Sequence, residues 1–338
     1  MLSKPLNVAG LFAGVGGIER GFQRAGFEIV SANEIDPYAA QTYVANNKHR
    51  LIVGDIADLS GKQLMQDAKG VEHKIGVLTG GFPCQPFSVA GHRLGFDDAR
   101  GNVFWDIHRL INELDPDVIF LENVKNLETH DSGRTFATIL GALDGSIESP
   151  SGSVLSTPYF VKSQVLNSKD FGVPQNRERV YIVGFKSQDA FKKFSFPEVT
   201  AVASQGRNLA AFIDFETKVD EKYYYRDNRP MFEQLSEAIT DPETVYQWRR
   251  HYVRANKSGV CPTLTANMGM GGHNVPLVLT KHGIRKLTPS ECFALMGLPG
   301  EVFPAGIAES RLYKQAGNAV VVPVIEAIAK RIKSALAS

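Results

Sequence analysis

Several features that mark particular protein classes are scarce in this sequence. The chain has only three cysteines in 338 residues, Cys84, Cys261 and Cys292. They lie far apart and form no CxxC pair, so we expect neither a disulfide framework nor a metal site. No apolar run is long enough to span a bilayer, and the start, MLSKPLNVAG, is too weakly apolar for a signal peptide. We therefore expect a soluble, cytoplasmic protein that does not enter a membrane.

A net charge of one sign is also missing. Lys and Arg number 37 and Asp and Glu 36, which leaves a formal charge of +1. The total does not indicate a nucleic-acid-binding protein, so the distribution of the charges has to be considered. Between Lys222 and Lys286, ten basic residues stand against five acidic ones, and Tyr246, Trp248 and Tyr252 interleave with them. This stretch predicts contacts with the phosphates and base edges of DNA, although a solvated basic face is the alternative.

The first half of the chain alternates short apolar runs with helical patterns. Seven runs bounded by turn residues predict strands, over 7–12, 27–32, 51–54, 75–80, 117–121, 159–166 and 179–185. Gly26 stands where a helix C-cap belongs, and Asp36 followed by Pro37 predicts a helix start. Strand–helix alternation is typical of an α/β protein with a doubly wound, mostly parallel sheet.

Beyond Phe185 the periodicity weakens, and it returns only in an amphipathic helix at the end of the chain. We therefore expect two domains. The first would comprise residues 1–187 and 304–338, and residues 188–303 would form a second, smaller and irregular domain.

Chemically distinctive residues follow five of the predicted strands directly. In open parallel sheets, ligands bind outside the carboxyl ends of the strands. In chain order, the five segments are FAGVGG at 12–17, Glu34, Asp55, FPCQ at 82–85 and ENV at 122–124. A glycine loop, acidic groups, a thiol and a further carboxylate would thus line one rim, which predicts an active site there.

The glycine loop suits a ligand that resembles a nucleoside. Gly14, Gly16 and Gly17 would let the backbone approach a ligand closely, and Glu34 can accept hydrogen bonds from ribose hydroxyls. A dinucleotide fingerprint would need glycine where Glu19 stands, and a negative side chain at a helix start repels a pyrophosphate. This disfavours a nicotinamide oxidoreductase. S-adenosylmethionine carries no phosphate and fits the loop, with a tight turn that binds nothing as the alternative.

The remaining rim residues also have alternatives. Asp55 can accept a hydrogen bond from an adenine amino group while Ile56 packs on the ring, or it can simply cap a helix. Cys84 lies between two prolines in a stiff loop that would present its thiol. A nucleophile needs the thiolate form, which a basic neighbour favours. Arg177 and Arg179, spaced at period two, would face one side and supply that charge, or would form a solvated strand end.

Six motifs then occur in the order in which one known family carries them. They are FAGVGG at 12–17, GGFPCQPFS at 80–88, ENV at 122–124, QNRER at 175–179, RKLTPSECFALMGLP at 285–299 and QAGNAVV at 315–321. On these motifs the chain resembles the cytosine-5 DNA methyltransferases of bacterial restriction–modification systems, except over roughly 196–259. The resemblance implies a Rossmann-like S-adenosylmethionine-dependent methyltransferase domain and a smaller target-recognition domain. It also implies a monomeric bacterial enzyme that binds double-stranded DNA and protects it from a cognate restriction endonuclease.

The resemblance assigns roles to individual residues. Cys84 would be the nucleophile, Glu122 the acid that contacts the cytosine ring, and Arg179 the group that holds the cytosine carbonyl. Arg177 would lie near the thiol and the carboxylate. The S-adenosylmethionine pocket would be formed by Phe12, Gly14, Gly16, Gly17, Glu34, Ile35, Asp55, Ile56, Pro83 and Asn318.

The implied reaction explains why these residue types are needed. Cys84 adds to carbon 6 of cytosine while Glu122 donates a proton toward N3, which makes carbon 5 nucleophilic toward a methyl group. We expect burial to raise the pKa of Glu122 so that it holds this proton. The base must be flipped out of the duplex, and residues 88–102 are predicted to close over the DNA as a lid, with an ordinary surface loop as the alternative.

Two other functions remain open on sequence alone. A related branch of the family methylates transfer RNA, although the Pro-Cys-Gln triplet and the sizeable variable segment favour DNA. A non-catalytic DNA-binding regulator on the same scaffold would be expected to lack the thiol or the acid, and both Cys84 and Glu122 are present.

Overall fold

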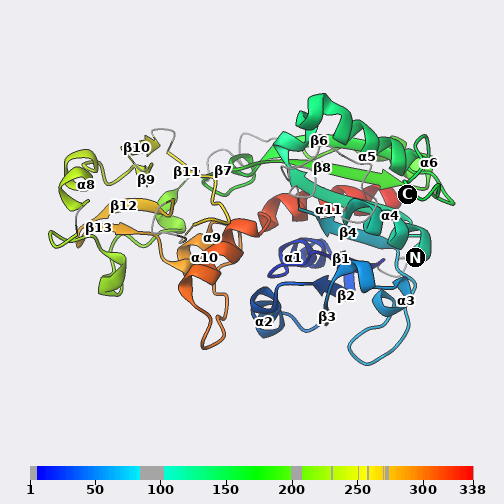
Figure 1. Cartoon of the computed structure of the whole chain (residues 1–338), viewed down its shortest axis with the longest axis horizontal. Helices are drawn as coiled ribbons and strands as arrows, with labels where there is room; N and C mark the ends of the chain where they lie inside the picture. The colour runs from blue at the N-terminus through cyan, green and yellow to red at the C-terminus, as the bar shows by residue number, and fades with distance from the viewer. Residues whose placement is uncertain are drawn as a thin grey trace. The chain divides into compact units, whose positions relative to one another are not determined.

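The chain folds into two compact units (Figure 1). The computed structural model describes residues 6–83, 103–198, 208–229, 231–249, 251–256, 259–268, 270 and 274–337. The first unit comprises Met1–Leu166, Glu178–Pro197 and Val324–Ser338, and the second comprises Asn167–Arg177 and Glu198–Pro323. No helix in the described ranges is long and apolar enough to cross a membrane.

The first unit is built on a seven-stranded sheet with the order β3-β2-β1-β4-β5-β8-β6. Its strands are β1 (Asn7–Leu11), β2 (Glu28–Glu34), β3 (Arg50–Val53), β4 (Val77–Gly81), β5 (Val118–Val124), β6 (Phe160–Asn167) and β8 (Glu178–Phe185). Strands β1 to β5 pair in parallel, and β8 runs antiparallel to β5. The seven predicted strands and the mostly parallel α/β class are therefore confirmed.

Helices cover both faces of this sheet (Figure 1). They include α1 (Gly17–Arg24), α2 (Pro37–Asn46), α3 (Gly61–Leu64), α4 (Val103–Leu114), α5 (Arg134–Asp144), α6 (Gln188–Lys193) and α11 (Val322–Leu336). Ile119 and Leu121 of β5 share a hydrophobic core with Phe104 of α4. Phe120, between them, points to the opposite face, where its ring lies 5.2 Å from that of Phe22 in α1. The sheet is thus doubly wound, as predicted.

Local signals set the helix ends of this unit. Asp36 caps the N-terminus of α2 by accepting two backbone N–H bonds. After α1, Gly26 adopts a φ of 84° and donates to the carbonyl of Gln23, while Phe27 donates to the carbonyl of Phe22. This pair of bonds is a Schellman motif, and the rings of Phe22 and Phe27 pack over it at 5.2 Å. Both predicted helix ends are confirmed.

The second unit is ordered around a four-stranded antiparallel sheet that sequence patterns did not predict (Figure 1). Its order is β10-β9-β12-β13, formed by β9 (Val245–Trp248), β10 (Val253–Asn256), β12 (Pro276–Thr280) and β13 (Gly283–Lys286). Other elements are β7 (Gln175–Asn176), β11 (Cys261–Pro262), α8 (Phe232–Ala238), α9 (Pro289–Ala294) and α10 (Glu309–Asn318). Tyr246, Leu277 and Ile284 form a core with Leu235 of α8. The region expected to be irregular is therefore a small folded layer.

Two segments join the second unit although we expected them in the first. β7 pairs with β11 in parallel, and the side-chain amide of Gln175 donates to the carbonyl of Leu295, 120 residues further on, at 2.8 Å. At the other end, the N–H of Val322 donates to the carbonyl of Met296 at 2.9 Å. The observed units thus differ in their bounds from the domains expected at 1–187 with 304–338 and at 188–303. Contacts of this range leave no periodic signal in a sequence.

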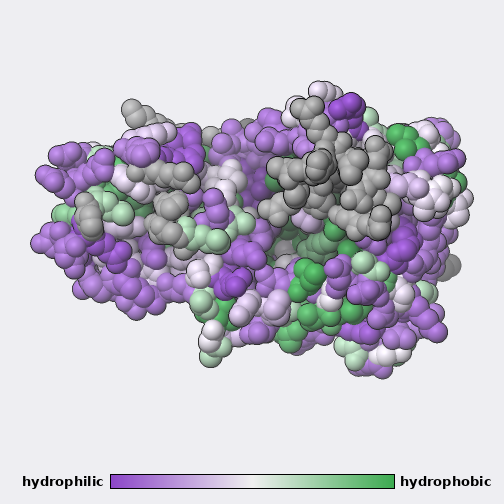
Figure 2. All heavy atoms as spheres, viewed as in Figure 1, coloured by the Kyte–Doolittle hydropathy of each residue, from purple (hydrophilic) through white to green (hydrophobic). Residues whose placement is uncertain are grey.

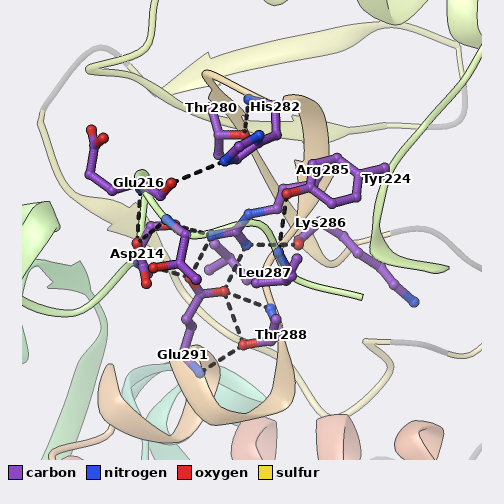
Figure 3. A network of polar contacts seen from close by, with 12 residues as sticks. Asp214, Glu216, Tyr224, Thr280, His282, Arg285, Lys286, Leu287, Thr288 and Glu291 are labelled. Atoms are coloured by element: carbon purple, nitrogen blue, oxygen red, sulfur yellow. Dashed lines mark hydrogen bonds and ion pairs between the residues drawn. The ribbon is translucent and has the colours of Figure 1, made fainter. Parts of the chain in front are cut away.

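A fully buried arginine organises the motif at 285–299 (Figure 3). Arg285 pairs with Glu291 of α9 through two bonds, Nη2 to Oε1 at 2.6 Å and Nη1 to Oε2 at 2.8 Å. The same carboxylate accepts from the backbone N–H of Thr288, the N-cap of α9, at 2.8 Å. Arg285 also donates to the carbonyl of Asp214 at 2.6 Å. Figure 3 shows these groups converging, so this motif ties β13, α9 and the Asp214 loop together.

Candidate active site at the carboxyl edge of the sheet

The carboxyl ends of β1 and β2 carry the first predicted site residues. Glu34 is only 8% exposed, and its carboxylate accepts backbone N–H bonds from Gly14 and Asp36, each at 2.7 Å. Phe12 and Gly14 both have left-handed φ angles, of 54° and 56°. Glu34 therefore holds the glycine loop in an unusual backbone conformation against the end of β2.

Gly16 and Gly17 shape the start of α1. Gly16 has a φ of 92°, and a Cβ at this position would lie 2.7 Å from Nδ2 of Asn47. Gly17 is the buried first residue of the helix. The sequence therefore needs glycine at 16 both for the backbone angle and for the close approach of Asn47.

The end of β3 is tied to β2 by Asn33. Its Nδ2 donates to the carbonyls of Ile52 and Gly54 at 3.1 and 3.0 Å. Asp55 follows, is exposed, and accepts from the N–H of Ala57 at 3.0 Å, so it caps the short 3-10 helix η1 (Ile56–Asp58). The helix-cap interpretation of Asp55 is thus seen directly, and its exposed carboxylate still faces solvent.

Exposed apolar side chains lie beside these carboxylates. Figure 2 shows hydrophobic side chains on the face of the first unit near β2, α2 and β3. Ile35 is 59% exposed and Val53 is 56% exposed. Ile56 is 3% exposed and packs in the core, and its expected contact with a ligand ring stays a prediction. An apolar surface next to hydrogen-bond acceptors can hold an aromatic ring and hydroxyl groups together.

Glu122, at the end of β5, pairs with Arg179 of β8. The distance from Arg179 Nε to Glu122 Oε1 is 3.1 Å, and the two side chains are 14% and 9% exposed. Glu122 also lies in register with Gly81, the last residue of β4. The rise in the pKa of Glu122 that we expected from burial stays a prediction. The predicted acid and the predicted carbonyl-binding arginine are therefore brought together.

Asn123, to which the sequence analysis gave no role, positions the chain that leads to the thiol. It is 2% exposed, its Nδ2 donates to the carbonyl of Phe82 at 3.0 Å, and its Oδ1 accepts from the N–H of Val124 at 2.8 Å. Pro83 is the next residue and is exposed. Cys84 and the predicted lid at 88–102 lie outside the described residues. The sequence feature that could have indicated the positioning role of Asn123 is its place directly after Glu122 in the ENV motif.

Arg177 and Asn318 belong to the second unit. Arg177 is 3% exposed and donates to three backbone carbonyls, those of Leu264 at 2.7 Å, Gly317 at 3.1 Å and Ala319 at 2.8 Å. Through these hydrogen bonds Arg177 joins separate segments of the second unit. Asn318 is exposed at the end of α10. Its predicted contact with the cofactor stays a prediction.

The two arginines of the QNRER motif therefore have different partners. We expected both to face one side of a single strand, but β7 ends at Asn176 and β8 begins at Glu178. A period-two argument needs one continuous strand, and the interruption removes its basis. Arg179 contacts Glu122, whereas Arg177 contacts backbone carbonyls.

The remaining cysteines lie outside this site. Cys261 and Cys292 are both 0% exposed and free of disulfides. Burial raises the pKa of both thiols, which keeps them unreactive, so they act as small hydrophobic residues. Within the described part of the chain, no group of three His, Cys, Asp or Glu side chains is placed to hold a metal ion.

Comparison with known proteins places this chain in one family. The C-5 cytosine-specific DNA methylase family matches residues 6–334. The Type II methyltransferase M.Bsp6I of Bacillus sp. (strain RFL6) is 51% identical over 97% of this chain and 98% of its own length. The Type II methyltransferase M.NlaX of Neisseria lactamica is 36% identical, over 97% and 96%. The S. pombe Dnmt2 methyltransferase has the same fold, with a TM-score of 0.68 at 20% identity and coverage of 98% of both chains.

These relatives favour DNA over RNA as the substrate, and methylases as a class require a methyl donor. The chain, with its ordered motifs and its carboxyl-edge site, belongs to the C-5 cytosine-specific DNA methylase family.

Proposed function

We propose that this enzyme transfers a methyl group from S-adenosylmethionine to carbon 5 of a flipped cytosine in a specific duplex sequence. The observation that carries the proposal is the contact between Glu122 and Arg179 at 3.1 Å. It lies at the strand end next to Gly81, three residues before Cys84 in the sequence. An acid paired with an arginine beside the chain that carries a cysteine supplies the groups that cytosine activation needs.

Each side chain has a separate task in the reaction. The sulfur of Cys84 forms a bond to carbon 6, and the ring electrons move toward N3, where Glu122 delivers a proton. Arg179 donates to the cytosine carbonyl and keeps Glu122 oriented. After carbon 5 has taken up the methyl group, a base removes the carbon 5 proton, the bond between sulfur and carbon 6 breaks, and the N3 proton returns to Glu122, which restores the aromatic ring. Asn123 acts as a positioning residue because it holds the carbonyl of Phe82 near the thiol-bearing segment.

The residues at the ends of β1 to β3 fit S-adenosylmethionine, which supplies a methyl group on a positively charged sulfur when bound. Each oxygen of Glu34 accepts one backbone N–H bond and retains a lone pair for a ribose hydroxyl. Ile35 offers an exposed apolar surface for adenine, and Asp55 offers an exposed acceptor. Among the described residues, no atom lies within 4 Å of a Cβ built at Gly14, which leaves room for a ligand in front of the loop.

We further propose that the first unit is the catalytic domain and the second the target-recognition domain. The basic residues of the second unit support this assignment, because phosphate contacts position a protein on duplex DNA. Methylation would then protect the modified DNA from a cognate restriction endonuclease.

Trapping with a modified base tests this proposal. A duplex that contains 5-fluorocytosine at the target blocks loss of the carbon 5 substituent, so the enzyme should remain covalently bound through Cys84. We expect a stable adduct by denaturing gel electrophoresis with the wild type and S-adenosylmethionine. Cys84→Ala should give none, and transfer RNA should not become methylated. Absence of an adduct from folded wild-type protein, on DNA that bisulfite sequencing shows to contain the target, would contradict the cysteine mechanism.

A further inference from the structure

The hairpin of β9 and β10 in the second unit has two chemically different faces. Tyr246 and Trp248 of β9 pack in the core of this unit with Val253 of β10. Two of the residues that alternate with them are polar: Gln247 lies in β9, and Arg254 is its direct partner in β10. Since alternate side chains of a strand share a face, these polar side chains point away from the core.

The polar face lines a cavity of about 260 Å³ within the second unit. Gln247, Arg249, Arg254 and Asn256 come from the hairpin, and Asn176 and Asn267 from neighbouring segments. None of the described side chains that line it is acidic. The cavity therefore combines positive charge with amide groups that can both donate and accept hydrogen bonds.

Gln247 is the unusual member of this set. The residue is only 6% exposed, and no hydrogen bond of its side-chain amide is found in the described ranges. The amide lines the cavity and is not among the buried polar groups that lack a partner, so it is accessible to a ligand there. Arg249 and Arg254 are exposed, and within the same ranges no carboxylate pairs with either. A ligand with acceptor atoms and one donor would complement all three groups.

We propose that this cavity binds the major-groove edge of one G·C base pair in the target sequence. The inference rests on the proposed function. Arg254 donates two parallel N–H bonds to N7 and O6 of the guanine, and the carbonyl oxygen of Gln247 accepts from the amino group of the paired cytosine. Arg249, beyond the end of β9, binds an adjacent phosphate. Arg254 and Gln247 are thus specificity-determining residues.

A base edge explains the site better than a phosphate does. A phosphate offers only acceptors, so it would pair with the arginines and provide no donor for the Gln247 carbonyl oxygen. A G·C edge presents two acceptors and one donor side by side in the major groove. Arg254 and Gln247 are direct partners across the hairpin, and together they supply donors and an acceptor that complement this edge.

The test begins with the target sequence of the wild type. Bisulfite sequencing of DNA modified by the enzyme identifies that sequence, and failure to methylate any DNA would count against the proposed function rather than this inference. Each guanine of the target is then replaced singly by 7-deazaguanine, which lacks N7, and by inosine, which keeps N7 and O6. We expect one position where 7-deazaguanine lowers kcat/KM by about 5- to 150-fold and inosine does not.

Arg254→Ala should lose this discrimination, so that 7-deazaguanine and guanine at that position are methylated equally. Arg254→Lys keeps the charge but not the two-pronged geometry, so it should also lose discrimination while it binds DNA normally. Gln247→Ala should relax the preference for cytosine opposite that guanine. Arg134→Ala, which removes an exposed arginine of the first unit, is the charge control and should change nothing.

Two results would overturn the inference. The first is an Arg254→Ala enzyme that is slower on every duplex by the same factor, with a shallower dependence on salt, because that pattern identifies a phosphate contact. The second is unchanged discrimination at every guanine. Circular dichroism of each variant excludes loss of folding, and Arg254→Lys keeps the test decisive if Arg254→Ala does not fold.

Discussion

At the scale of single residues, two glutamates of the first unit have opposite surroundings. Glu122 is paired with Arg179, whereas Glu19 is fully buried and, among the described residues, neither of its carboxyl oxygens finds a hydrogen-bond partner. Glu19 lies against Gly10, where a Cβ would stand 2.0 Å from its Oε1. Burial raises the pKa of Glu19 to about 8. One acid therefore has a cationic partner, whereas burial of the other raises its pKa and favours its neutral form.

Glu19 should make the stability of the protein fall as pH rises. Between its ordinary pKa of 4.5 and about 8, the folded state keeps a proton that the unfolded chain has lost. The free energy of unfolding then decreases with pH by at most ~1.4 kcal/mol per unit. Glu19→Gln removes this effect, so its advantage over the wild type should grow from pH 5 to pH 8.

Thermal unfolding of both proteins at several pH values measures that difference. Burial lowers the pKa of His49 to about 4, but this group is common to both proteins and cancels in the comparison. If the difference between the melting temperatures of the two proteins is the same at every pH, Glu19 does not titrate as described.

Glu122→Gln should slow methyl transfer by about 10²- to 10⁴-fold, the usual contribution of a positioned proton donor. Binding of S-adenosylmethionine should be unchanged, because Glu34 lies on a different strand. Single-turnover transfer of a labelled methyl group measures the rate, and calorimetry measures binding. Glu178→Gln is the matched control, since Glu178 is next to Arg179 and forms an exposed pair with Lys125. Equal losses in both variants would exclude a specific role for Glu122.

At the scale of elements, sequence patterns predicted the first unit because its signals are local. Most strands of the large sheet contain a short apolar run, and Gly26 and Asp36 mark helix ends through contacts within a few residues. The four strands of the antiparallel sheet in the second unit have four or five residues each. Alternation such as that of Gln247 between Tyr246 and Trp248 is too short there to stand out from chance.

From the buried ion pair of Arg285 and Glu291 we predict a large effect on the stability of the second unit. Glu291→Ala leaves the buried guanidinium of Arg285 without its anion, so we expect a loss of about 3–5 kcal/mol in the free energy of unfolding. The variant Arg285→Met with Glu291→Leu removes both charges and should recover much of that loss. Denaturation followed by the fluorescence of Trp248, in a Trp105→Phe background, reports on this unit.

Lys281→Ala provides the control for that measurement, because Lys281 forms an exposed pair with Glu216. Pairs of this kind contribute about 0–1 kcal/mol. A loss from Glu291→Ala no larger than that from Lys281→Ala would mean that the buried network does not support α9.

At the scale of the whole molecule, the site was predictable where it follows strand ends and unpredictable where it depends on distant backbone. Glu34 and Glu122 were placed correctly at the sheet edge because parallel strands bring their carboxyl ends together. The partners of Arg177 are carbonyls 87 to 142 residues away. Every residue has a backbone carbonyl, so the pattern of side chains does not indicate which carbonyls accept hydrogen bonds. Neither the contacts of Arg177 nor the bounds of the two units could therefore be predicted from composition and periodicity.

Ligand binding should stabilise the first unit selectively. S-adenosylmethionine at about 100 times its Kd should add ~2.7 kcal/mol to the unfolding free energy of the unit that binds it. Glu34→Ala should lose most of this gain, because it removes both the acceptor and the anchor of Gly14. Glu28→Gln, at the exposed opposite end of β2, should keep it. Fluorescence of Trp105 during heating measures the shift, and an equal gain in both variants would place the cofactor elsewhere.

The two-faced hairpin of the second unit also bears on how such enzymes diversify. Tyr246 and Trp248 pack in the core from one side, so we expect exchanges at Gln247 and Arg254, on the other side, to leave the core intact. On the base-pair contact proposed above, such exchanges should produce new target sequences in few mutational steps without a change in the first unit. In directed evolution, a library confined to this outward face should yield altered specificities at little expense in folded protein.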